Sequence, residues 1–230
     1  SSYDVRSEDW QETSPMYEVN MSYDKTFDRE GQSLKAEVRY FQNYEDSESN
    51  ITEKLYLSPD DMSHSIFDLY QRTKENQSMR NVQATVDYVH PFAQKAQWEI
   101  GGKYTFRGIN DWSGVTQKGD DGQYHPLEDY CYDYEYNEQV SALYTSIGND
   151  WGRWSAQVGL RAEMTNIYTN MKGYAHDGND SINRTDTINL FPSAHINYSF
   201  NENNQLQISY TRRIRRPGFW DMSPFRSYND

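Results

Sequence analysis

Alternation of apolar and polar side chains with a period of two is the feature that most constrains how this chain can fold. Between Trp154 and Met164 every second residue is apolar, whereas Ser155, Gln157 and Glu163 stand between them. Successive side chains of a β-strand point to opposite faces, so this pattern predicts a strand with one apolar and one polar face. Repeated along the chain, it predicts an all-β fold of about eight strands.

The predicted strands are joined alternately by short turns and by long polar connections. They cover residues 15–27, 33–42, 81–90, 95–107, 130–147, 152–165, 188–200 and 205–215. Tight turns at 28–31, 90–92, 148–150 and 201–204 link them in pairs. The connections at 43–79, 108–129 and 165–187, and the start at 1–14, are expected to be irregular. Outer-membrane barrels have short periplasmic turns and long extracellular loops, and on that assignment both chain ends lie outside the cell.

Two local patterns within the predicted strands indicate further details of their structure. Adjacent glycines, Gly101 and Gly102, suggest a bulge or bend in strand 95–107. In strand 130–147 one phase is rich in tyrosine, and we assign it to the apolar face, with Glu135 and Gln139 opposite. The residues in this phase are Tyr130, Tyr132, Tyr134, Tyr136, Val140, Ala142 and Tyr144.

The composition excludes most other classes of protein. Only 35% of residues are hydrophobic, which is low for a soluble core, yet 15% are aromatic and 20 are tyrosine, far too many for a disordered chain. A transmembrane barrel resolves the conflict, because only alternate residues face lipid and aromatic residues collect at the two interfaces. No run of about 18 apolar residues exists for a membrane helix. We therefore predict a transmembrane antiparallel up-and-down β-barrel.

Charge and reactive residues argue against several functions. The net charge of −13 argues against a nucleic-acid partner. The single Cys131 cannot form an internal disulfide. The five histidines lack metal-ligand spacing, and no nucleophile triad or phosphate-binding glycine motif is present. Acidic loops at 120–121 and 177–180 lack the full spacing of calcium ligands. We expect no enzyme, no metal and no cofactor.

Two motifs in the last third of the chain resemble a known family. Ser209 to Ile214 followed by Arg216, Pro217, Trp220, Asp221, Pro224 and Phe225 forms the first, in which a strand runs into an aromatic segment. Residues 159–163 followed by 190–193 form the second, Gly-Leu-Arg-Ala-Glu then Leu-Phe-Pro-Ser. Both are similar to passages in the outer-membrane β-barrel domains of Bacteroidetes TonB-dependent receptors.

The resemblance implies a role and a set of partners. The chain would be a partial barrel domain, residues 1–230, of a cell outer membrane receptor that takes up a ligand. Barrels of that type have about 22 strands. A plug domain, which this chain lacks, would connect the barrel to TonB. Outer-membrane lipid and lipopolysaccharide would surround the wall, and a surface lipoprotein caps some related importers.

Candidate ligand-binding residues lie in and after the last predicted strand. Arg213 and Arg215 share the polar phase and are expected to face the lumen, where they would bind an anionic ligand or a plug carboxylate. The simpler interpretation pairs them with lumen acids such as Glu163 or Glu135. Aromatic candidates for stacking on a glycan or an apolar siderophore follow in the next segment. They are Phe219, Trp220 and Phe225.

Arg212 and Arg216 fall in the lipid-facing phase, where they would reach lipopolysaccharide phosphates at the outer interface. Two other functions stay open from the sequence alone. One is a plugless porin-like or structural outer-membrane barrel. The other is a soluble all-β carbohydrate-binding module, which would bury two apolar sheet faces against each other.

Overall fold

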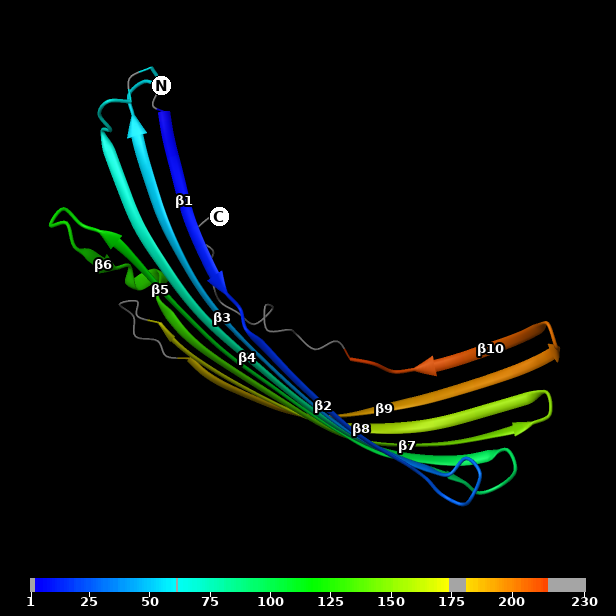
Figure 1. Cartoon of the computed structure of the whole chain (residues 1–230). Coiled ribbons are helices and arrows are strands. Elements are labelled where there is room, and N and C mark those ends of the chain that lie inside the picture. Colours follow the sequence, from blue (N-terminus) through cyan, green and yellow to red (C-terminus); the bar gives the residue numbers. More distant parts are fainter. Residues whose placement is uncertain (1–2, 61, 174–180, 215–230) are drawn as a thin grey trace.

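The computed structural model describes residues 3–60, 62–173 and 181–214, and it contains one antiparallel sheet. Each long strand pairs with the next long strand along the chain, so the topology is up-and-down (Figure 1). The long strands form the order β3, β4, β5, β7, β8, β9 and β10. Their bounds are β1 Tyr3–Thr13, β2 Met16–Thr26, β3 Ser33–Tyr56, β4 Phe67–Pro91, β5 Ala96–Lys118, β6 Tyr124–Pro126, β7 Tyr132–Trp151, β8 Trp154–Gly173, β9 Ser181–Asn201 and β10 Asn204–Thr211, with a 3-10 turn η1 at Glu128–Tyr130.

β1 and β2 together make one edge of the sheet. Both pair antiparallel with β3, β1 with its second half and β2 with its first half. Pro15 separates them, because proline has no N–H to donate to the ladder. The Pro15 carbonyl still accepts a 3.1 Å hydrogen bond from the Tyr44 N–H. Counting β1 and β2 as one strand and β6 as a spur on β5, the eight predicted strands are all present.

The strands are much longer than the sequence pattern predicts. Residues 43–56 and 67–79, expected as loop, extend β3 and β4, and β5, β8 and β9 also continue into predicted connections. The start of the chain is likewise strand β1 rather than irregular. Residues 43–56 and 67–79 are mostly polar on both faces, so their sequence shows no clear alternation of apolar and polar residues. Backbone pairing with a neighbouring strand stabilises them without an apolar face.

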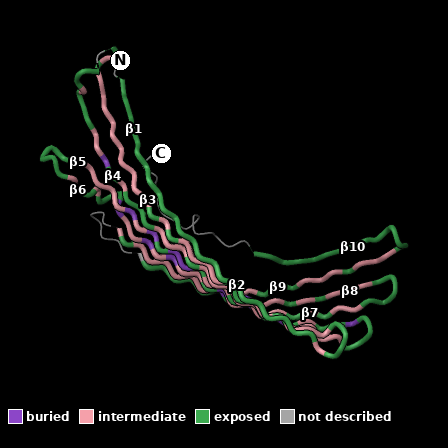
Figure 2. Tube along the Cα trace, in the orientation of Figure 1, coloured by how far each residue is buried: buried purple, intermediate pink, exposed green. Residues whose placement is uncertain are grey.

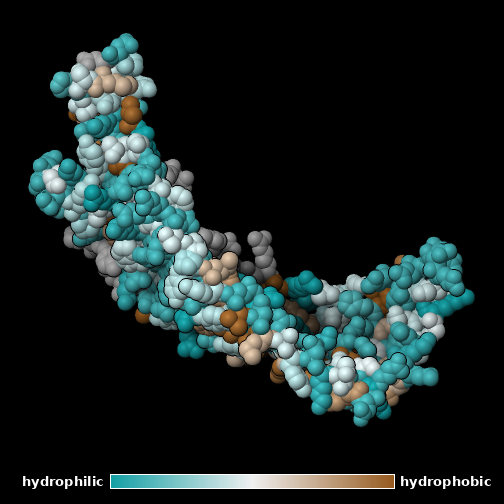
Figure 3. Space-filling model, viewed as in Figure 1, coloured by the Kyte–Doolittle hydropathy of each residue, from teal (hydrophilic) through white to brown (hydrophobic). Residues whose placement is uncertain are grey.

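One face of the sheet, here called the outer face, carries a continuous band of exposed apolar side chains. The register aligns its members across all the long strands; Val86 of β4, for example, lies beside Gly102 of β5. Figure 3 shows the hydrophobic atoms mainly around the middle of the sheet, with hydrophilic atoms towards both ends. The apolar band comprises Val19, Met21, Val38, Val86, Ile100, Leu143, Ile147, Val158, Leu160, Ile188, Leu190, Ile196, Leu206 and Ile208.

The height of the apolar band matches a lipid bilayer. On β8 it runs from Trp154 at the turn to Met164, close to the 9–11 residues (about 25 Å when tilted) that a transmembrane strand needs. Beyond Met164 the same face continues with Asn166, Tyr168 and Asn170. The band therefore begins at the short turns and ends where the long strand extensions enter water. Among the described residues, no helix is long and apolar enough to cross a membrane.

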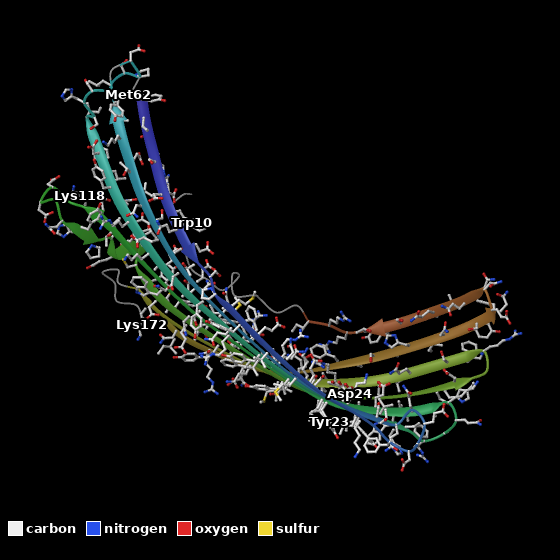
Figure 4. The ribbon with its side chains drawn as sticks, viewed as in Figure 1. Trp10, Tyr23, Asp24, Met62, Lys118 and Lys172 are labelled. Atoms are coloured by element: carbon white, nitrogen blue, oxygen red, sulfur yellow. The ribbon has the colours of Figure 1, made fainter. Side chains whose placement is uncertain are left out.

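The opposite face, here called the inner face, is polar and more crowded. Tyr23 and Asp24 of β2 show the two faces side by side, since consecutive residues point in opposite directions (Figure 4). Most of the buried residues lie in the middle of the long strands (Figure 2). On the inner face they are Gln71, Ile109, Asp111, Ser113, Tyr134, Tyr136, Val140, Ala142, Glu163 and Thr165. Here polar side chains are buried on one face and apolar side chains are exposed on the other. A soluble domain shows the opposite arrangement, whereas the wall of a membrane barrel typically shows this one.

The predicted facing of β7 is wrong. Leu143 and Ile147 belong to the apolar band, 73% and 48% exposed, whereas Tyr144 and the other tyrosines share the inner face with Lys103 and Glu163. The tyrosines outnumber the two aliphatic residues, so the sequence pattern favoured the wrong phase. The register with β5 and β8 determines which face of β7 is outward, because the apolar faces of those two strands align with the odd-numbered residues of β7.

Candidate functional site: the inner face of the barrel wall

A network of polar side chains crosses four strands on the inner face, level with the apolar band. The Tyr144 hydroxyl donates a hydrogen bond to the Asp87 carboxylate of β4, and the Arg161 guanidinium of β8 lies 5.2 Å from the Tyr144 ring centroid. Arg161 Nε donates in turn to Glu163 Oε1 at 2.6 Å. The network ties β4, β7 and β8 together across β5, and its one arginine pairs with Glu163 while Asp87 accepts from the tyrosine hydroxyl.

Gly101 makes room for this network. The tyrosine ring lies over the glycine, where an added Cβ would come 2.3 Å from Tyr144 Cε2 and 2.6 Å from Asp87 Oδ1. The predicted bulge is absent, because Asp87 pairs with Gly101 and Val86 with Gly102 in unbroken register. These glycines therefore serve packing rather than backbone bending.

Above the apolar band, the inner face carries a buried aromatic cluster. Ile109, Tyr134 and Tyr136 are each no more than 2% exposed and form its centre. Partly buried residues from β4, β7 and β8 pack around it. They are Met79, Tyr132, Ile167 and Met171. Its position on the strand extensions means that the extracellular part of the wall has a small core of its own, which stiffens it in water.

Acidic groups border the aromatic cluster. The Tyr136 hydroxyl donates to Glu138 Oε2 at 2.9 Å, and the Tyr132 hydroxyl approaches Asp111 Oδ2 at 3.5 Å. Asp111 is only 7% exposed. Burial, and then the nearby Glu75 carboxylate, raise the pKa of Asp111 to about 6, although the Tyr132 hydrogen bond opposes the shift. This part of the wall therefore presents negative charge that depends on pH.

We expect the extracellular strands to loosen as pH rises through the pKa of Asp111. That pKa lies above its ordinary value of 3.8, so the folded chain holds a proton that the unfolded chain has lost. The stabilising contribution is fully present below 3.8 and is lost as pH rises through about 6. Hydrogen exchange of residues 107–113 and 132–136 at pH 5 and pH 7.5, corrected for intrinsic rates, should show more protection at pH 5.

Asp111→Asn is the control for this prediction, since it keeps the shape of the side chain and removes the titration. Its protection in these two segments should be the same at both pH values. A pH effect that survives in Asp111→Asn would assign the titration to another group.

The structure separates the sequence-predicted site residues. Arg213 is exposed just beyond the end of β10. Arg215, Phe219, Trp220 and Phe225 lie outside the described residues, as does Arg216, so their proposed roles stay predictions. The two acids offered as partners do not share a face: Glu163 lies on the inner face beside Arg161, whereas Glu135, paired with Asn170, lies on the outer face.

The sequence interpretation missed the inner-face network and the aromatic cluster. Both involve the tyrosines of β7, which were assigned to lipid. One feature of the sequence could have indicated the correct facing of β7. Leu143 and Ile147, four residues apart, lie in the phase opposite to the tyrosines, in a strand with few other aliphatic residues.

Comparison with curated protein sequences gave no significant match. Among solved structures, the ferric citrate transporter FecA, in its unliganded form, is similar with a TM-score of 0.40 and 15% identity over 74% of this chain and 25% of FecA. The siderophore receptor PiuA of Acinetobacter baumannii gives 0.35 and 9%, over 92% of this chain and 49% of PiuA.

The translocator domain of the autotransporter NalP of Neisseria meningitidis gives a TM-score of 0.35 and 11% identity, over 81% of this chain and 62% of that domain. The chain thus spans a quarter to about three fifths of these proteins. A family model matches residues 25–230, nearly the whole described sheet. By that match, and with a wall built as a membrane barrel requires, the chain belongs to the outer membrane protein β-barrel family and resides in the outer membrane.

Proposed function

We propose that the chain is part of the wall of a TonB-dependent receptor that takes up a ligand across the outer membrane. The observation that supports this most is the contrast between its faces. The outer face is apolar only at membrane height, while the inner face is polar and continuously packed far above it. A tall, stiff inner wall suits a receptor that holds a ligand outside the cell before admitting it.

The remaining parts of the proposal follow from the resemblance and the open sheet. β1 with β2, and β10, each have one unpaired edge among the described residues. Unpaired backbone groups in lipid cost several kcal/mol each, so these edges require partner strands. Barrels of about 22 strands with a plugged lumen provide them. TonB would act through the plug, and the wall would supply binding surface rather than the moving part.

The acids of the inner face favour a ligand that is cationic or carries amine groups. Asp111, Glu75 and Glu138 face the lumen above the membrane, and the described inner face there offers Arg107 as a nearby positive charge. Arg213, a candidate for binding an anionic ligand, lies beyond the end of β10, whereas these acids lie on β4, β5 and β7. The acidic inner face therefore favours the class of cationic ligands.

Conductance of the native, full-length protein in planar lipid bilayers tests the proposal. A plugged receptor should show almost no current at neutral pH, and current should appear only when mild denaturant loosens the plug. Stable open channels in the untreated protein would instead support the plugless porin-like alternative. A soluble carbohydrate-binding module does not accord with an exposed apolar band of membrane height.

A further inference from the structure

A pocket of about 420 Å³ lies on the outer face, well above the apolar band. β4 and β5 form one side, and the segment from β6 through η1 to β7 folds over the other. Most of its lining is apolar, with a few charged groups at the rim, as in small-molecule sites. The residues that line this outer-face pocket are Arg72, Lys74, Trp112, Gly114, Thr116, Pro126, Glu128 and Cys131.

The floor of the outer-face pocket is an indole ring. A Cβ at Gly114 would come 2.7 Å from Trp112 Cη2, so the indole occupies space that only a glycine leaves free. Trp112 and Pro126 both line the pocket. A flat aromatic surface together with an apolar ring suits the C–H face of a sugar.

The rim of the outer-face pocket carries two cations in defined positions. The Arg72 guanidinium lies 4.0 Å from the Tyr124 ring centroid, which orients it, and the Thr116 hydroxyl donates to the Arg72 carbonyl at 3.4 Å. Lys74 pairs with Glu48 at 3.4 Å on the exposed side of β3. Arginine in a fixed orientation binds phosphate or carboxylate well.

The face on which the pocket lies excludes the lumen as the source of its occupant. Arg72, Lys74 and Trp112 share the even-numbered phase of β4 and β5 with Val86 and Ile100 of the apolar band. The pocket therefore opens outward, on the same side as the lipid. Whatever occupies it approaches from around the barrel rather than through it.

The height of the outer-face pocket above the membrane further restricts the kind of molecule that can occupy it. Trp112 lies six residues beyond Phe106, the last large apolar residue before it on the outer face of β5. At roughly 3.3 Å per residue and a tilt of about 40°, the pocket is roughly 15 Å above the band. The polar headgroup layer of a bilayer is only about 5–8 Å thick on each side. At this height the neighbours of an outer-membrane barrel are the sugars of lipopolysaccharide.

We propose that the outer-face pocket binds a negatively charged sugar of the outer-leaflet lipopolysaccharide. The sugar ring stacks on Trp112, and its phosphate or carboxylate group pairs with Arg72 and Lys74. This contact fixes the extracellular strands against the leaflet around them. The assignment rests on the outer-membrane location of the chain and is independent of what the lumen transports.

Lipopolysaccharide binding to the native, full-length protein tests the assignment. The protein is purified from its outer membrane in mild detergent, stripped of lipid and titrated with lipopolysaccharide from the same membrane. We expect R72Q/K74Q to weaken binding by about tenfold for each cation removed, the effect of one charge-assisted hydrogen bond. Gly114→Leu, which drives the indole off the floor, should weaken it as well.

Three comparisons make the test decisive. Lys172→Gln removes an exposed cation from the same face of β8, outside the pocket, and should leave binding unchanged. Lipopolysaccharide stripped of its phosphates and with its sugar carboxylates reduced should bind native protein and R72Q/K74Q alike. A folded R72Q/K74Q protein, checked by the heat-dependent shift in gel mobility, that binds as tightly as native protein would overturn the assignment. So would equal loss in Lys172→Gln, or binding in this pocket of a soluble peptide in place of lipopolysaccharide.

Discussion

Replacing Leu143 by arginine should destabilise the barrel by about 2–4 kcal/mol, the cost of a cation on the lipid face near the bilayer midplane. Leu143 is 73% exposed on the outer face and lies between Gly102 and Ala162, in the middle of the apolar band. An arginine here has no partner and is too far from either interface for its head to reach water easily. Urea unfolding of the full-length protein in lipid vesicles measures the loss.

Ser146→Arg is the matched control on the same strand. Ser146 lies on the inner face, where its hydroxyl donates to Glu99 Oε2 at 3.2 Å, so an arginine there meets a carboxylate. We expect a change of less than about 1 kcal/mol, as for a solvated ion pair. The sequence-predicted facing of β7 requires the opposite ranking. If Ser146→Arg strongly lowered the free energy of unfolding and Leu143→Arg did not, the facing of β7 predicted from the sequence would be correct and the structure would be contradicted.

The fold class was predictable because a lipid-facing strand must show its period. At membrane height every second residue has to be apolar, and Trp154 to Met164 does so without exception. The turn at 201–204 was predictable for a similar reason, since Asn residues favour turns, and it joins β9 to β10. The turn predicted at 148–150 is wrong: these residues pair with β8 as part of β7, and the chain turns at Gly152 and Arg153, where Gly152 has a positive φ of 63°. The facing of β7 was predicted wrongly because its inner face is rich in tyrosine, a residue that suits both a lipid interface and a packed lumen wall.

The strand extensions were not predictable from periodicity. Residues 43–56 pair throughout with β1 and β4, yet both of their faces are polar. In water a paired strand needs neighbours for its N–H and C=O groups but no apolar face, so its sequence resembles that of a loop. The aromatic cluster around Tyr136 was hidden because its members come from β4, β5, β7 and β8 and meet only through register.

The candidate site was predictable only where one strand carries it. The sequence placed Arg213 within a strand 205–215, whereas β10 ends at Thr211 and leaves Arg213 just beyond it. The network of Asp87, Tyr144 and Arg161 could not, because it depends on which residues of three different strands come level with one another. Register of that kind is set by turn geometry and by the sum of many pairings, and no local motif records it.

Gly101→Val should be the most damaging small substitution on the inner face, at about 3 kcal/mol. The new side chain would occupy the space of the Tyr144 ring, 2.3 Å from Cε2 at its Cβ alone, and would press on Asp87. Overpacking costs about 1–3 kcal/mol, and the hydrogen bond to the carboxylate contributes about as much again. Displacing the ring also removes it from Arg161. The same vesicle unfolding measurement reports the loss.

Gly102→Val separates this packing effect from a general intolerance of side chains in β5. Its Cβ would lie 3.4 Å from Leu143 Cδ2 on the outer face, an ordinary contact, so we expect almost no loss. The double variant Gly101→Val with Tyr144→Ala then tests the cause. Once the ring is gone, the valine has space, so the double variant should be little worse than Tyr144→Ala alone. Strictly additive losses would mean that Gly101 is required for its backbone, as the bulge hypothesis supposed, and that the tyrosine is incidental.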